Sequence, residues 1–194
     1  MASTLRGFFV SALLWLLVAL ALWYPLRHWM VLAPAWLAQE VMTTVFPRWA
    51  TGAQLEGGTQ VLLTTLRVWS ADNRVGELAP EVNGLVYVYG APLLAALLLA
   101  SRPRGWWWKL PVGLLALIPF QAWGICLHWL LQVAVVMGEH TRGQTRFGAL
   151  ATNLIAAGYQ FGFLILPTLA PVLLWLGFDR RVLAGARVGR IRNP

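Results

Sequence analysis

Four long apolar segments constrain the fold of this chain more than any other feature of its sequence. They cover about residues 7–26, 83–100, 110–137 and 147–178, and about 20 apolar residues of helix cross about 30 Å of hydrocarbon. Hydrophobic residues make up 59% of the 194 residues and charged residues only 11%, whereas about a quarter of a soluble domain is charged. The sequence therefore predicts a single all-α polytopic membrane domain with four transmembrane helices.

The first segment has some features of a secretory signal, because Ala19-Leu20-Ala21 resembles a cleavage site. Its apolar run continues through Trp23 and Tyr24, which makes it longer and bulkier than the apolar part of a signal peptide. We interpret it as a membrane anchor that is retained.

Charge divides unequally between the two sets of flanks that the four segments create. One set has six basic and six acidic residues, so the whole formal net charge of +8 lies on the other set. The positive-inside rule then predicts a bacterial inner-membrane protein with both termini in the cytoplasm, a periplasmic loop at 27–82 and a cytoplasmic tail at 179–194. Nine basic residues and one acidic residue form the predicted cytoplasmic set: Arg6, Arg102, Arg104, Lys109, Arg180, Arg181, Arg187, Arg190, Arg192 and Asp179.

Tryptophan is abundant, with 12 residues, and indoles favour the interface between lipid and water. Trp106, Trp107 and Trp108 stand beside Lys109 at the start of the third segment, and we expect them to anchor that span at the membrane surface. The basic residues flank apolar spans and form no aromatic-interleaved patch, which predicts the lipid bilayer as a partner and argues against nucleic acid.

The predicted periplasmic loop has two elements. Residues 28–46 carry apolar residues at helical spacing and few charges, as a helix lying on a membrane surface does, and Pro47 ends this helix. Two β-prone runs within 54–61 flank Gly57-Gly58, and the second continues to Val68. This pattern predicts a small β-hairpin.

Seven polar residues lie inside the spans or at their entrance, where a polar group without a partner is costly and is a functional candidate by default. Spacings of seven and four residues place those of the third span on one helical face, and those of the fourth on another. The set predicts a polar pocket that opens to the periplasm; the alternative is hydrogen bonding between helices alone. Gly158 and Gly162 form a G-x-x-x-G pattern, which favours close helix packing. The seven residues are Glu81, Asn83, Gln121, His128, Gln132, Asn153 and Gln160.

Motifs of hydrolases, zinc proteases and nucleotide-binding proteins are all missing from the sequence. The single cysteine, Cys126, excludes an intrachain disulfide and a cysteine-based zinc site. His28, His128 and His140 are too scattered along the chain to predict a metal site. We therefore expect no catalytic residue, no metal and no cofactor.

Three stretches follow one another in a distinctive order: Val45-Phe46-Pro47, then Glu81-Val82-Asn83-Gly84-Leu85 at the opening of a span, then 119–128 on the third span. This order resembles the exosortase and archaeosortase family of membrane transpeptidases. Those enzymes have A-C-S-G-L in the second stretch, P-x-A-x-x-x-N-x-x-R in the third, and a later outer histidine, for which His140 is the candidate here. The resemblance places Val82 at the nucleophilic Cys, Ile125 at the Asn and His128 at the Arg.

Valine cannot attack a carbonyl, so the resemblance implies a relative or companion without catalysis. Residues 119–124 and 158–171 are similar to the exosortase H-associated membrane protein family. That similarity implies an accessory protein that partners an exosortase-like sorting enzyme or its substrate's membrane anchor. Three alternatives remain open: an active membrane cysteine enzyme using Cys126 and His128, a small transporter subunit, and a structural subunit of a larger membrane complex.

Overall fold

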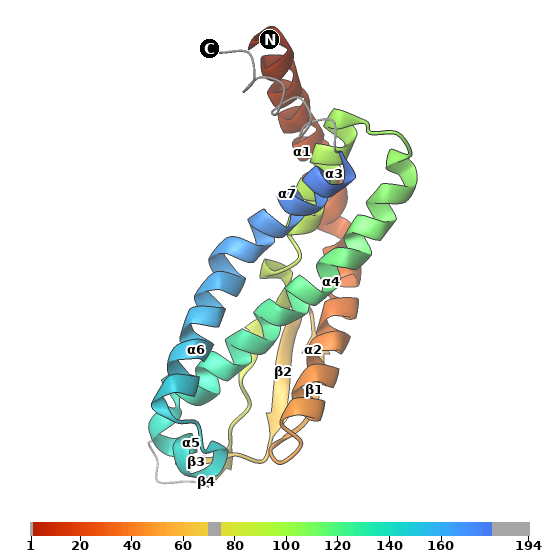
Figure 1. The fold of residues 1–194 in the computed structure, drawn as a ribbon. Coiled ribbons are helices and arrows are strands. Elements are labelled where there is room, and N and C mark those ends of the chain that lie inside the picture. Colours follow the sequence, from red (N-terminus) through yellow and green to blue (C-terminus); the bar gives the residue numbers. More distant parts are fainter. Residues whose placement is uncertain (1, 70–74, 180–194) are drawn as a thin grey trace, which may run out of the picture. The chain divides into compact units, whose positions relative to one another are not determined.

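The computed structural model describes residues 2–69 and 75–179. Within this part, four helical stretches are long and apolar enough to cross a membrane: Arg6–Val45, Gly84–Ser101, Trp106–Val136 and Ala149–Phe178. Two small antiparallel β-sheets, one of three strands and one of two, accompany the helices (Figure 1). The predicted fold class, an all-α polytopic membrane protein with a small β-hairpin, is confirmed. The tail 180–194, with its five arginines, lies outside the described residues.

The chain divides into two compact units, which we describe separately. Unit 1 comprises Met1–Leu26, Tyr89–Leu117 and Thr168–Pro194, and unit 2 comprises Arg27–Val88 and Ile118–Pro167. Among the described residues, unit 1 therefore holds the connection between the second and third spans. Unit 2 holds the large loop and the connection between the third and fourth spans.

The first two helices are nearly continuous. Helix α1 covers Ala2–Met30 and helix α2 covers Leu32–Val45, with Val31 alone between them. The helix predicted at 28–46 is divided between the end of α1 and α2, and both belong to the candidate span Arg6–Val45. α2 ends just before Pro47, because proline offers no N–H to extend it. α2 packs against strand β1 (Ala50–Glu56) in unit 2 (Figure 1).

Strand β1 and strand β2 (Thr59–Thr64) form the predicted hairpin. Gly57 and Gly58 connect them with φ values of +57° and +99°, and two-residue hairpin turns of this kind need positive φ at both positions. A third strand, β5 (Glu81–Asn83), pairs with the far side of β2, so that Val82 lies opposite Gln60. This long-range pairing brings the start of the second candidate span onto the hairpin.

The predicted second run stops short of Val68. β2 ends at Thr64, and a separate strand β3 (Arg67–Trp69) pairs with β4 (Val75–Glu77) in a two-stranded sheet. The Thr65 N–H still donates to the Trp49 carbonyl, 3.0 Å away and in register with the Ala50–Thr64 pair, before the chain leaves β2.

The remaining helices are listed here with their bounds. The second span begins irregularly, with the 3₁₀ turn η1 (Gly84–Val86) before helix α3 (Gly90–Ser101). The third span is α4 (Trp106–Leu131) followed by the π-helical turn η2 (Gln132–Val136), and the short α5 (Gly138–Thr145) follows it. The fourth span is α6 (Ala149–Gln160), the π-helical turn η3 (Phe161–Ile165) and α7 (Leu166–Phe178).

In unit 1, polar groups join the ends of three helices. The Lys109 ammonium donates to the Phe178 carbonyl at 2.9 Å, which places a positive charge at the C-terminus of α7, where the helix dipole is negative. The Trp175 indole N–H donates to the Ser101 hydroxyl at 2.9 Å. Trp107 is 71% exposed at the start of α4, as an indole that contacts the membrane interface would be.

Candidate functional site

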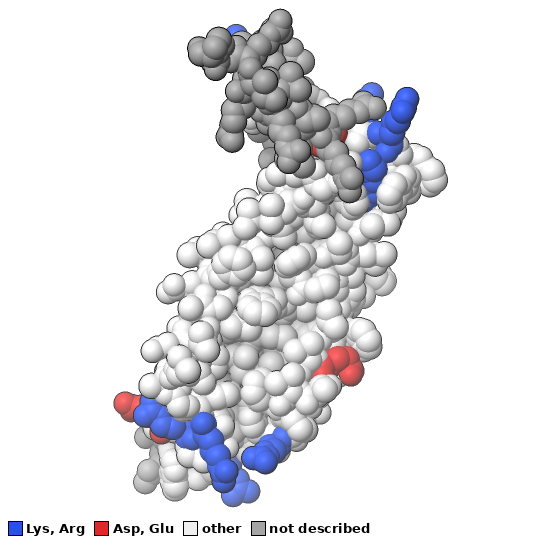
Figure 2. Space-filling model, viewed as in Figure 1, with Lys and Arg blue, Asp and Glu red and all other residues white. Residues whose placement is uncertain are grey.

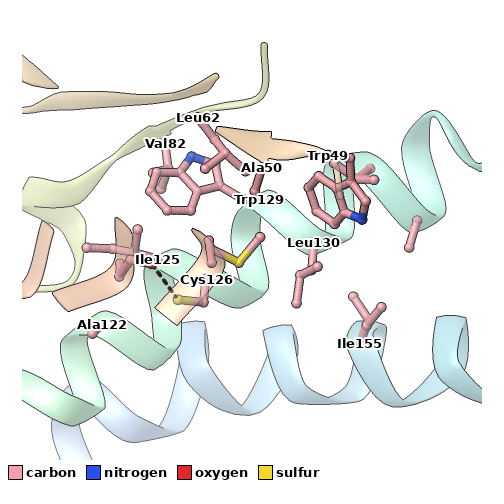
Figure 3. Packing of buried hydrophobic residues seen from close by; sticks show 14 of the residues in the cluster. Trp49, Ala50, Leu62, Val82, Ala122, Ile125, Cys126, Trp129, Leu130 and Ile155 are labelled. Carbon is pink, nitrogen blue, oxygen red and sulfur yellow. Dashed lines mark hydrogen bonds between the residues drawn. The ribbon is translucent and has the colours of Figure 1, made fainter. Parts of the chain in front are cut away.

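The centre of unit 2 is an apolar cluster built from β2, β5 and α4. Strand β5 alternates, with Val82 buried and its two neighbours exposed. Val82 is 2% exposed, and Ile125 and Trp129 of α4 are fully buried in the same cluster. Figure 3 shows Val82 and Leu62 next to the Trp129 indole. The position that the exosortase resemblance assigns to a nucleophile is thus filled by packed hydrocarbon.

Two hydrogen bonds at this cluster join α4 to β2 and β2 to α2. The Trp129 indole N–H donates to the Gln60 carbonyl at 3.3 Å, and the Gln60 side-chain amide donates to the Ala35 carbonyl of α2 at 2.8 Å. Gln60 is 2% exposed, and its Oε1 has no hydrogen-bond partner among the described residues. The alternation of β2 would have found it, since Gln60 is in phase with the buried Leu62.

Cys126 is buried on the side of α4 that faces α2. Its thiol lies 3.6 Å from the Ala38 carbonyl, to which it donates. Cys126 also lines a cavity of about 320 Å³ between the two helices. This cavity is apolar, and no Lys, Arg, His, Asp or Glu lines it. The lining residues besides Cys126 are Leu37, Val41, Met42, Val45, Phe46, Pro119, Ala122, Trp123, Leu127 and Leu130.

His128 lies in a different environment from Cys126. Its Nδ1 is 3.0 Å from the hydroxyl of Tyr87, and its ring meets that of Tyr159 edge to face, with the centroids 5.2 Å apart. Tyr159 in turn stacks on Phe163. Cys126 and His128 are two positions apart in the helix, so their side chains point to different faces. Histidine and thiol therefore contact different partners, and no hydrogen bond joins them within the described residues.

Gln132 joins the π turn η2 to strand β5. Its Oε1 accepts the Glu81 N–H at 3.2 Å, while its Nε2 donates to the Glu81 carbonyl. Gln144 of α5 binds Arg67 of β3 in the same two-bond manner, at 2.9 Å and 2.8 Å. Asn83 accepts the Leu85 N–H and so caps η1. All three side-chain amides thus form hydrogen bonds with backbone groups.

The other predicted site residues lie apart from these. Gln121 is buried in α4, at 8% exposure. Asn153 and Gln160 are exposed on the surface of α6, and neither has a hydrogen bond to a described residue. The structure thus brings Glu81 and Gln132 together, but it places Asn153 and Gln160 on an outer face. His140 is exposed on α5.

The two glycines of the G-x-x-x-G pattern contact α4. A Cβ added at Gly158 would lie 2.6 Å from Leu127 Cδ1, and one at Gly162 would lie 3.0 Å from Trp123 Cδ1 and 3.4 Å from Gly124 Cα. The Trp123 indole N–H also donates to the Gly158 carbonyl, at 3.4 Å. α6 and η3 thus approach α4 closely because neither glycine has a side chain.

These features define a class of protein: a polytopic membrane protein with four candidate spans, two small sheets and an apolar cluster in unit 2. No group of three or more His, Cys, Asp or Glu in residues 2–69 and 75–179 is arranged to hold a metal ion. The family model described as "Exosortase H-associated membrane protein" matches residues 2–182, and the chain belongs to this family. Searches of the curated proteins and of the solved structures found no match.

Proposed function

We propose that this chain is a non-catalytic accessory protein of the bacterial inner membrane that binds an exosortase and supports its protein-sorting reaction. The observation that carries the proposal is the environment of Val82. In the order of parts shared with exosortases, Val82 stands where the enzyme keeps its nucleophilic cysteine, and it is 2% exposed within an apolar cluster. A buried alkyl group has neither a lone pair nor access to a substrate.

The second departure supports the same conclusion. Ile125 stands at the position of the family's asparagine and is fully buried in the same cluster. Two positions that would serve chemistry in the enzyme serve packing here. A protein that keeps the order of parts of an exosortase, but has packed side chains at the catalytic positions, is suited to binding rather than catalysis. The family description names exosortase H as the associated protein.

Orientation follows from charge in this proposal. The flanks with nine basic residues and one acidic residue face the cytoplasm, which directs the β-hairpin and α2 toward the periplasm. In this proposal the exosortase acts on that side, on a substrate anchored in the membrane by a C-terminal helix. The accessory protein would stabilise the enzyme or help to present that helix.

The environment of Cys126 argues against the rival view of an active cysteine enzyme. Cys126 donates to a backbone carbonyl, and His128 is bonded to Tyr87. A nucleophilic cysteine is activated by an adjacent base, a nearby positive charge or a metal, and the cavity that Cys126 lines has no Lys, Arg, His, Asp or Glu among its lining residues.

Co-purification in mild detergent tests the proposal. The tagged chain is co-expressed with the exosortase of the same cell, and the enzyme is quantified in the eluate against an unrelated tagged four-span protein. We expect the exosortase to co-elute specifically. Elution of the chain alone, at the level of the control, would refute the proposed function.

A further inference from the structure

Among the exposed residues of helix α6 and turn η3, five recur at alternating spacings of three and four. Leu150 is 73% exposed and Leu164 is 65% exposed, and the three residues between them, Asn153, Ala157 and Gln160, are exposed as well. Spacings of three and four repeat every 3.5 residues on average, which is the spacing of a helix–helix contact in a left-handed pair. We call these five residues the α6 seam.

The opposite face of α6 is already used inside unit 2. Ile155 is 9% exposed and belongs to the central cluster, and Gly158 and Gly162 meet Leu127 and Trp123 of α4. The helix therefore has one side packed against its own protein, while the α6 seam is left uncovered by the described residues of unit 2.

Two of the exposed seam residues, Asn153 and Gln160, have amide side chains that need hydrogen-bond partners. Eleven residues of helix place Gln160 about 16 Å along the axis from Ala149, at a rise of about 1.5 Å per residue, inside the candidate span Ala149–Phe178. Lipid tails offer no hydrogen-bond donor or acceptor, so an amide at that depth remains unsatisfied until another protein group reaches it. Asn153 repeats the same group two helical turns earlier. The two amides, Asn153 and Gln160, therefore need hydrogen-bond partners from another protein group within the membrane.

The lack of charge and the small residue at the middle of the α6 seam restrict the kind of partner that it can bind. Residues 147–178 contain no Asp, Glu, Lys or Arg. In the middle of Figure 2 the surface over α4 and α6 carries no charged side chain, whereas charges gather over α5 and the β3–β4 hairpin. Ala157 stands between the two amides, and small residues let two helix backbones approach. An uncharged transmembrane helix fits this surface.

We infer that the α6 seam binds a transmembrane helix of the exosortase, which places Ser, Thr, Asn or Gln side chains about seven residues apart against Asn153 and Gln160. The choice of the exosortase over a second copy of this chain rests on the proposed function and on the family description. The amides set the register of the two helices, because each is satisfied only when its partner lies opposite.

Two seam variants test this inference in the co-purification described above. In the Asn153→Leu/Gln160→Leu variant both amides are lost, and in Ala157→Trp the middle of the seam is blocked. We expect each to lower the co-eluting exosortase at least about tenfold, about 1.4 kcal/mol of binding. Ala21→Trp is the matched control, because Ala21 is an exposed alanine of α1 outside the seam. It should leave co-elution unchanged.

The results of this experiment distinguish failure of the seam inference from failure of the proposed function. If the unaltered chain retains the exosortase and both seam variants retain it equally, the seam is refuted while the proposed function stands. Failure of the unaltered chain refutes the proposed function itself. Ala157→Cys in a Cys126→Ser background identifies the occupant by cross-linking. A cross-link to the exosortase supports the inference, and a disulfide between two copies of the chain overturns it.

Discussion

Gly124 is the position at which a single added methyl group should disturb the core most directly. It lies on α4 in unit 2, and a Cβ built there falls within the van der Waals radius of the Tyr87 ring, 3.2 Å from Cγ and nearer still to Cδ1 and Cε1. Tyr87 is 2% exposed, and its hydroxyl is fixed by His128. The ring has little room to move away, so Gly124→Ala should displace it.

The magnitude follows from three contributions. Forcing a methyl group into a packed core costs about 1–3 kcal/mol, and loss of the hydrogen bond between Tyr87 and His128 costs about 0.5–1.5 kcal/mol. Alanine forms helix more readily than glycine, which offsets up to about 1 kcal/mol of this destabilisation. We expect a net destabilisation of about 0.5–4.5 kcal/mol, which lowers the Tm by about 1–18 °C for a chain of this size.

Thermal unfolding of the purified protein in detergent measures this effect. Gly7→Ala is the control, because Gly7 is also inside a helix and a Cβ there meets nothing within 4 Å; its Tm should stay equal or rise. The Tyr87→Leu/Gly124→Ala double variant should lose at least about 1 kcal/mol less than the sum of the two single variants, since removing the ring removes the clash. An unchanged Tm in Gly124→Ala, or strict additivity in the double variant, would show that this reasoning is wrong.

Three further outcomes are expected. Gln132→Leu removes two hydrogen bonds to the β5 backbone and should cost about 1–3 kcal/mol by the same thermal measurement, whereas Gln54→Leu, at an exposed position of β1, should cost less than about 0.5 kcal/mol. Gly58→Ala should destabilise by more than about 1 kcal/mol, because its φ of +99° strains any side chain and its Cβ would meet Leu85 at 2.8 Å; Gly52→Ala, which meets nothing within 4 Å, is the comparison. Cys126→Ala should leave sorting of an exosortase substrate in cells unchanged, and a lost sorting signal with normal protein levels would instead favour the cysteine-enzyme alternative.

Much of the fold could be predicted because hydropathy and turn chemistry are local signals. Four apolar runs gave the class, and Gly57-Gly58 gave the hairpin, because positive φ values there require glycine. Strand β5 could not be found in this way. It has only three residues, and its pairing with β2 depends on a contact more than 20 residues away along the chain.

The predicted site shows the same limit. Polarity and helical spacing singled out Gln132 and His128 but could not say what each contacts. The partner of Gln132 is the backbone of β5, which has no signature in the sequence, and the partner of His128 is Tyr87, an aromatic residue in an apolar run. The spacing of Asn153 and Gln160 predicted one shared face, and both residues are exposed on α6. Whether that face points inward or outward depended on Gly158 and Gly162, which turn the other side of α6 toward α4.

The two glutamine–backbone pairs have a consequence for how this protein can meet an unfolded chain. A strand at the edge of a sheet normally offers its free N–H and C=O groups to any extended peptide, for recognition or for aggregation. Gln132 occupies those groups at Glu81, and Gln144 occupies them at Arg67. At these two residues an exported polypeptide finds no free backbone groups with which to pair as an added strand. The sheet edges are thus closed to an added strand at these two points.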